Sequence, residues 1–116
     1  TIPSSVESIG TEAFKNSGLT TIELPSSITS FGFGVFSSCS FLVSVKIPSS
    51  VESIGESAFA DCTSLTNLEL SSSVKIIGVE AFAGCENLDL VIDNSEDNVE
   101  VRPQAFQNCK SVTWKK

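Results

Sequence analysis

One unit of 22–24 residues recurs along the whole chain, and this repeat limits the possible folds more than any other feature. The stretch IPSSVESIG stands at 2–10 and again, unchanged, at 47–55. Phenylalanines recur at intervals of 22, 23, 23 and 24 residues, at positions 14, 36, 59, 82 and 106. A unit this short cannot bury an apolar face alone, so successive copies are expected to stack and share one core.

Each copy contains a strand pattern, a turn and a second short apolar segment. The stretches at 19–24, 42–47 and 65–70 alternate apolar and polar residues over their last four positions, which is typical of a strand. A turn of Pro and Ser follows, and then VESIG-like segments lead through a glycine into a short Ala-Phe segment, expected to form 3₁₀ or similar helical turns. The pattern predicts an α/β repeat, a right-handed solenoid of about five coils. Its parallel sheet occupies one face, and short strands and turns occupy the other.

The chain has the length of one domain, and we expect residues 1–116 to form a single repeat domain. The predicted coils are about 1–23, 24–46, 47–69, 70–91 and 92–116.

Composition excludes several classes of partner. The net charge is −7 and only seven Lys and Arg residues are scattered along the chain, which argues against nucleic acid, since phosphate binding needs clustered cations. No apolar run approaches the ~18–20 residues of a membrane span, so no membrane insertion is expected of this segment. The chain begins at TIPSS, and no signal-peptide pattern is visible there.

The repeat resembles the leucine-rich repeat of the BspA type, found in surface proteins of bacteria and some protozoa. The unit CTSLTNLELSSSVKIIGVEAFAG (62–84) carries the pattern L-x-x-L-x-L, and related copies add P-x-S-V-x-x-I-G-x-x-A-F-x-x-C over nearly the whole chain. Ser17 in place of the first Cys, and Arg102 with Pro103 in the last copy, depart from it. The resemblance implies an extracellular or cell-surface location and a role in adhesion.

The cysteines recur with the period of the coil, so they are predicted to stack along one internal edge. They are Cys39, Cys62, Cys85 and Cys109. Neighbouring Cα atoms about 5 Å apart would permit a disulfide, which stays an alternative. We favour a buried row of free thiols, because side chains in register rarely reach the disulfide torsion and Ser17 takes the same place in the first copy. Without His or a CxxC motif, no metal or cofactor is expected.

Catalysis has little support in this sequence. Without His, neither a Ser-His-Asp triad nor a Cys-His pair is possible, and a thin solenoid offers no deep cleft. We therefore predict no enzyme and no catalytic residues.

Asp93, Ser95 and Asp97 alternate as calcium ligands do, but Asn98 and Gln104 stand where an EF-hand loop needs Gly and Glu. A solvated acidic loop is the favoured interpretation, and calcium-dependent binding is the alternative.

The strand pattern predicts which side chains point outward from the sheet. The candidate binding residues on this face are Thr21, Glu23, Ser44, Lys46, Asn67 and Glu69. Short polar side chains of mixed charge suit a protein ligand, and sheets of solenoids commonly bind proteins.

Three aromatic residues stand where other copies carry polar or variable residues, so they are expected to point outward and are candidate contact anchors. They are Phe33, Phe41 and Trp114. The place of Phe33 holds Thr11, Glu56, Val79 or Pro103 elsewhere; that of Phe41 holds Ser64, Asn87 or Ser111; and Trp114 aligns with Thr21, Ser44 and Asn67. The favoured interpretation is structural: Phe33 and Phe41 fold back over the second coil, and Trp114 covers the open end of the stack.

These observations favour a non-catalytic protein-binding module, the C-terminal part of a surface or secreted protein that adheres to host proteins or matrix. A structural spacer that presents another domain is the alternative. Because the chain begins partway through a coil, its first face is expected to expose apolar side chains. A preceding coil or end-to-end self-association of two molecules would cover them.

Overall fold

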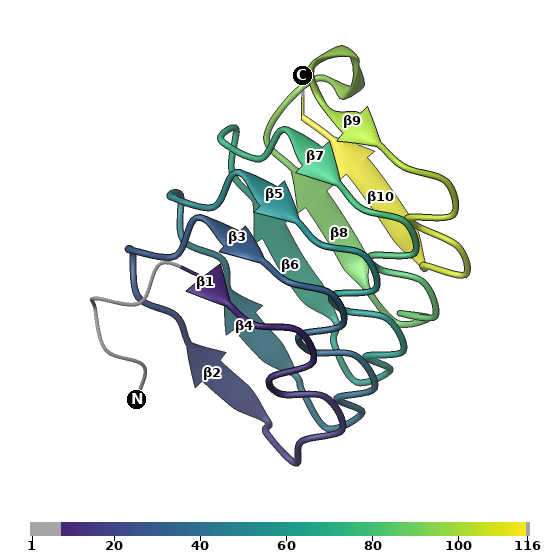
Figure 1. Cartoon of the computed structure of the whole chain (residues 1–116). Coiled ribbons are helices and arrows are strands. Elements are labelled where there is room, and N and C mark those ends of the chain that lie inside the picture. Colours follow the sequence, from purple (N-terminus) through teal and green to yellow (C-terminus); the bar gives the residue numbers. More distant parts are fainter. Residues whose placement is uncertain (1–7, 116) are drawn as a thin grey trace.

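The computed structural model describes residues 8–115 as a stack of coils (Figure 1). Each coil contributes two strands, one to each of two rows on opposite sides of the molecule. Residues 1–7 and 116 lie outside the described part, and with them most of the first IPSSVESIG copy. One row consists of β1 (Ser8–Ile9), β3 (Ser30–Phe31), β5 (Ser53–Ile54), β7 (Ile76–Ile77) and β9 (Glu100–Val101). The other consists of β2 (Thr21–Glu23), β4 (Ser44–Lys46), β6 (Asn67–Leu70), β8 (Asp89–Ile92) and β10 (Ser111–Trp114).

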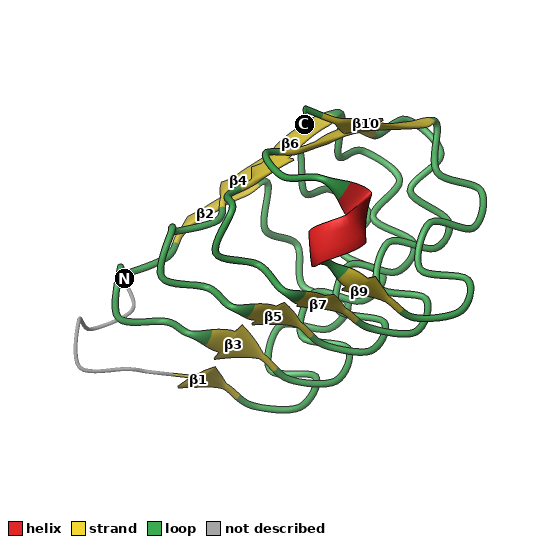
Figure 2. Cartoon of the chain, turned by 90° about the horizontal axis from the view of Figure 1, so that it is seen from above, coloured by secondary structure: helices red, strands yellow, loops and turns green. Residues whose placement is uncertain are grey.

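All strand pairs in both rows are parallel, which confirms the predicted solenoid. The first row is one five-stranded sheet in the order β1-β3-β5-β7-β9. The second row contains two ladders, β2-β4 and β6-β8-β10, and Figure 2 shows its strands following one another along one side of the molecule. We call the outward side of this second row the sheet face. The stack measures 34 × 26 × 20 Å.

The Ala-Phe segments between the two rows are tight turns rather than continuous helix. In the third coil the Ala58 and Ala60 N–H groups donate to carbonyls three residues back, at 3.2 and 3.1 Å, as in a 3₁₀ turn. The Phe59 N–H between them donates instead to the Ala81 carbonyl of the next coil, at 2.7 Å. Because every second N–H is used between coils, a helical ladder cannot continue here.

Left-handed backbone accompanies these turns. Ser57 and Asp61, two residues before and two after Phe59, have φ of 57° and 60°, and the other coils place positive φ at the same two positions. The single helix among residues 8–115 is the 3₁₀ helix η1 (Glu96–Asn98), which lies in the β8–β9 loop near β9, drawn in red in Figure 2.

The recurring phenylalanines form one continuous stack through the core. Ring centroids of Phe14, Phe36, Phe59 and Phe82 follow one another at 5.4, 5.2 and 5.3 Å in stacked geometry. The middle three rings are fully buried, whereas Phe14 and Phe106 on the end coils are half-buried. Burial of one such ring contributes about 1.5–3 kcal/mol, and each aromatic pair about 0.5–1.5 kcal/mol more.

The four cysteines are free thiols, and each of them donates a hydrogen bond to the preceding coil. Cys39, Cys62 and Cys85 donate to the Phe carbonyl of the preceding coil at 3.0, 3.1 and 3.0 Å. The Cys109 thiol instead donates more weakly to the Leu88 carbonyl of the preceding coil, at 3.8 Å, and to the Ser111 carbonyl, at 3.7 Å. A small hydrogen-bond donor at this position of the repeat therefore links each coil to the preceding one.

The repeated glycine lies where two coils approach most closely. A Cβ atom added at Gly55 would overlap the Phe31 carbonyl oxygen and lie 2.7 Å from the Gly32 carbonyl oxygen. Both atoms belong to the backbone of the preceding coil, so neither can move aside as the end of a flexible side chain could. At Gly10, in the first coil, the added Cβ meets no atom within 4 Å.

We expect Gly55→Ala to lower the free energy of unfolding by about 1–3 kcal/mol, the usual cost of forcing extra volume into a packed site. Urea denaturation followed by circular dichroism measures the change. Gly10→Ala is the matched control and should be nearly neutral, so equal losses in the two variants would contradict the proposed backbone contact.

Stability should also decline at alkaline pH through Cys109. Burial, and to a lesser extent the neighbouring Cys85 thiol, raises the pKa of the Cys109 thiol from 9.0 to about 11. Between these values the folded chain keeps a proton that the unfolded chain releases, so the free energy of unfolding falls as pH rises from 9 to 11. Cys109→Ser should show a shallower fall in urea denaturation across this window. If the free energy of unfolding falls equally with pH in the two proteins, Cys109 is not the group responsible for the decline.

Candidate binding surface

The sheet face presents two rows of outward side chains that cross the strands. Alternation within each strand buries one residue and turns the next to solvent, as in β6, where Leu68 and Leu70 are buried and Asn67 and Glu69 exposed. By register within each ladder, and by equivalent places in the repeat between β4 and β6, one row contains Thr21, Ser44, Asn67, Asp89 and Ser111. The other contains Glu23, Lys46, Glu69, Val91 and Thr113.

The six residues predicted from the sequence all lie on this face and are exposed. Four members of the two rows were missed, namely Asp89, Val91, Ser111 and Thr113. The missed residues belong to the last two coils, where the spacing from Cys to strand changes. Asn67 stands five positions after Cys62, whereas Asp89 stands only four positions after Cys85. The alternation of SVTW in β10 could have located Ser111 and Thr113, whereas DLVI in β8 gives no such signal, since three apolar residues follow Asp89.

A groove runs across the strands over both rows. One part, of about 640 Å³, is lined by β4, β6 and β8 and by the turns that follow them, including Ser71 and Asp93. The adjoining part, of about 530 Å³, is lined by β2, β4 and the turn residue Ser26. The two parts share Lys46 and Pro48, so they form one surface that spans four coils.

Carboxylates outnumber cations along this groove. The acidic lining residues are Glu23, Glu69, Asp89 and Asp93, and Lys46 is the basic one. Two lysines of the last coil approach the acidic groups from the side. Lys115 Nζ lies 3.4 Å from Glu69 Oε2, and Lys110 Nζ lies 3.5 Å from Asp89 Oδ2.

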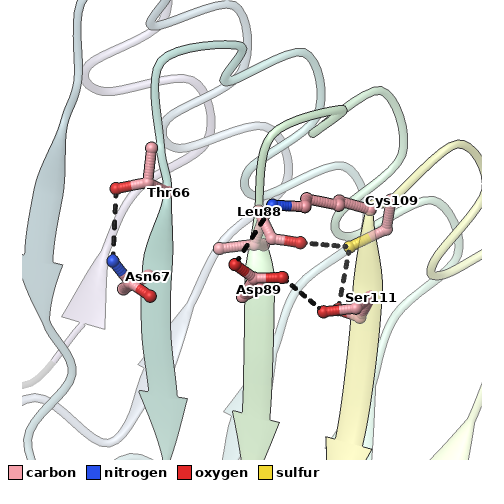
Figure 3. Close-up of polar contacts among 7 residues, drawn as sticks. Thr66, Asn67, Leu88, Asp89, Cys109 and Ser111 are labelled. Atoms are coloured by element: carbon pink, nitrogen blue, oxygen red, sulfur yellow. Dashed lines mark hydrogen bonds and ion pairs between the residues drawn. The ribbon is translucent and has the colours of Figure 1, made fainter.

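Asp89 is held in the ionised state by its neighbour on β10. The Ser111 hydroxyl donates to Asp89 Oδ1 at 2.6 Å, as Figure 3 shows. This hydrogen bond, aided by the charge of Lys110, holds the pKa of the Asp89 carboxyl below its ordinary value of 3.8. On the next strand, Asn67 Nδ2 donates to Thr66 Oγ1 at 3.4 Å. The face therefore offers a fixed negative charge beside an amide group.

The three predicted aromatic anchors differ in exposure. Phe33 and Phe41 are 44% and 63% exposed. The alignment of Trp114 with Asn67 is wrong, because β10 pairs Trp114 with Ile92 and places Ser111 opposite Asp89. The stretch between Cys109 and β10 is two residues shorter than the equivalent stretch before β8, which shifts every later residue. Ser111, for the same reason, does not share the place of Phe41.

Trp114 is half-buried at the end of the stack rather than exposed. Its ring lies edge-on against Phe106, with centroids 6.4 Å apart. This contact covers one side of the last phenylalanine, as expected if Trp114 covers the end of the stack.

The acidic β8–β9 loop uses its oxygens to hold its own backbone. Ser95 Oγ accepts the Asp97 N–H and caps η1, and the buried Asn94 accepts from Ser95 N–H and Asn98 Nδ2. Among residues 8–115, no cluster of three His, Cys, Asp or Glu side chains is arranged to hold a metal ion. Within the same range, no helix has the length and apolarity required to span a bilayer.

Comparison with known families agrees with this geometry. The sequence model of the family described as "BspA type Leucine rich repeat region" matches residues 1–113, in six copies. The chain belongs to this family. A search of curated proteins finds no match.

Solved bacterial structures resemble the BspA-type chain over nearly all of its length. A leucine-rich repeat protein of T. pallidum is 35% identical, with a TM-score of 0.85 over 94% of this chain and 51% of its own. One from Eubacterium ventriosum is 35% identical, with a TM-score of 0.85 over 97% and 31%. A protein of Faecalibacterium prausnitzii, described as a leucine rich cell surface protein, is 28% identical, with a TM-score of 0.81 over 99% and 31%. The chain thus spans about half of the first and a third of the others.

Removal of the Ser111 hydroxyl should raise the pKa of Asp89 toward its ordinary value of 3.8, because that hydrogen bond is the largest influence on the carboxyl. An NMR titration of the Asp89 side chain in Ser111→Ala measures the shift. Lys110→Ala provides the comparison and should move the pKa less; a larger effect of the lysine would show that charge, rather than hydrogen bonding, controls Asp89.

Proposed function

We propose that this chain is a non-catalytic protein-binding module that adheres to host proteins or matrix through the sheet face. The groove across β2, β4, β6 and β8 is the observation that carries the proposal, because it is the hollow that joins the outward side chains of four coils. The surface location of a related F. prausnitzii protein, named for the cell surface, supports the same role.

The construction of the face suits recognition rather than chemistry. Its outward side chains are polar apart from Val91, and the backbone beneath them is paired in fixed register within each of the two ladders. A surface that is already ordered loses little conformational entropy when a partner binds. The exposed Phe33 and Phe41 are additional contact points that we assign to the same module.

A bulky residue at the centre of the groove should block attachment. Asn67→Trp places a large ring between Ser44 and Asp89, and we expect at least ~10-fold weaker attachment to surfaces coated with decellularised host matrix, equivalent to about 1.4 kcal/mol. Bead-attachment or biolayer measurements give the ratio. Ile76→Trp is the matched control, since Ile76 is exposed on β7, on the opposite side of the solenoid.

The outcome also separates adhesion from the spacer hypothesis. If the wild-type chain fails to attach, or if Asn67→Trp attaches as well as the wild type, the sheet face is not an adhesive surface. The rigid stack would then be interpreted as a spacer that presents another domain.

A further inference from the structure

The last coil places its own lysines on the acidic side chains of the groove. Lys115 follows β10, and its backbone N–H donates to the Ile92 carbonyl at 3.0 Å. Its partner Glu69 lies on β6, two strands away, so the Lys115 side chain extends over β8 to make the 3.4 Å contact. Lys110, which directly precedes β10, reaches Asp89 on the adjacent strand β8, at 3.5 Å.

Both contacts are open to solvent. The side chains of Lys115 and Glu69 are 49% and 59% exposed, and those of Lys110 and Asp89 are 60% and 46% exposed. Ion pairs of this kind are weak, since water and salt screen them. An ammonium or guanidinium group from another protein can therefore replace either lysine at little cost.

The floor beside the carboxylates suits the rest of a basic side chain. Pro48 and Val91 line the same part of the groove as Glu69 and Asp89. Apolar surface next to a carboxylate accommodates the methylene stem of a lysine or arginine while the charged end reaches the oxygen. The groove also crosses the strands, which repeat about every 4.8 Å, so an extended segment laid along it meets one coil after another.

We propose that the sheet face binds lysine and arginine side chains of an extended segment of a partner protein, with Glu69 and Asp89 as the receiving carboxylates and with Lys115 and Lys110 displaced. The inference rests on the proposed function and specifies its partner. Lys115 and Lys110 act as internal competitors: removal of a lysine should strengthen binding, and removal of its carboxylate partner should weaken it.

The test uses a labelled peptide of alternating Lys and Gly and a counterpart of alternating Glu and Gly, with binding followed by fluorescence anisotropy at low ionic strength. We expect the lysine peptide to bind the 116-residue chain, and the glutamate peptide not to bind. Glu69→Gln should weaken binding by about threefold and Lys115→Ala should strengthen it by about threefold, the scale of an exposed ion pair. Added salt should weaken all of these complexes.

The chain supplies a matched control for net charge. Glu12 and Lys15 form another exposed pair, at 3.0 Å, in the turn of the first coil that precedes β2. Glu12→Gln and Lys15→Ala change the same charges away from the groove and should leave the affinity nearly unchanged. If they shift it as much as Glu69→Gln and Lys115→Ala do, the peptide responds to overall charge alone and the proposed site is wrong. Unchanged circular dichroism in all four variants verifies that each one is folded.

Failure of this inference is distinguishable from failure of the adhesive role. Loss of matrix attachment in Asn67→Trp, together with equal peptide binding by Glu69→Gln and Glu12→Gln, would retain the binding face and overturn the basic partner. Selective peptide binding with unimpaired matrix attachment in Asn67→Trp would support the cation site and overturn adhesion through this face.

Discussion

Backbone hydrogen bonds between equivalent residues of neighbouring coils are the constraint on which the rest of this structure depends. They join β-strands in both rows, and in the turns they occupy every second N–H, as from Phe59 to Ala81. This pairing fixes the distance between coils at about 4.8 Å. Equivalent side chains of neighbouring coils therefore pack against one another, and rows of phenylalanine and cysteine fill the interior without a central helix.

The same short distance explains the residues that are not part of the core. Gly55 faces the backbone of the preceding coil where no side chain fits. Residues such as Ser57 and Asp61 adopt left-handed backbone so that the turn can alternate between internal bonds and bonds to the next coil. The cost of that backbone, about 1–2 kcal/mol at each non-glycine residue, is offset by burial of the ring that the turn carries into the core.

The character of the groove comes from irregularity at one end of the repeat. In the last coil the connection into β10 is two residues shorter, which brings Ser111 beside Asp89 and Trp114 beside Phe106. Lys110 and Lys115 then lie within reach of carboxylates on β8 and β6. The last coil continues the two rows through Ser111 and Thr113, and it also adds counterions to the face and partly covers the open end of the phenylalanine stack.

The sequence by itself determined the solenoid, its parallel strands, the burial of the recurring phenylalanines and the exposed face of the first three coils. The reason is that residues that recur once per repeat become neighbours in space when short units stack. It did not determine the turn conformation, since hydrogen bonds to the next coil replace those of a local helix. Nor did it place Trp114, Asp89 and Ser111, because a change of one or two residues in a connection shifts the register, and only the strand pairing records that shift. The ion pair between Lys115 and Glu69 likewise depended on tertiary structure, which brings together residues two coils apart.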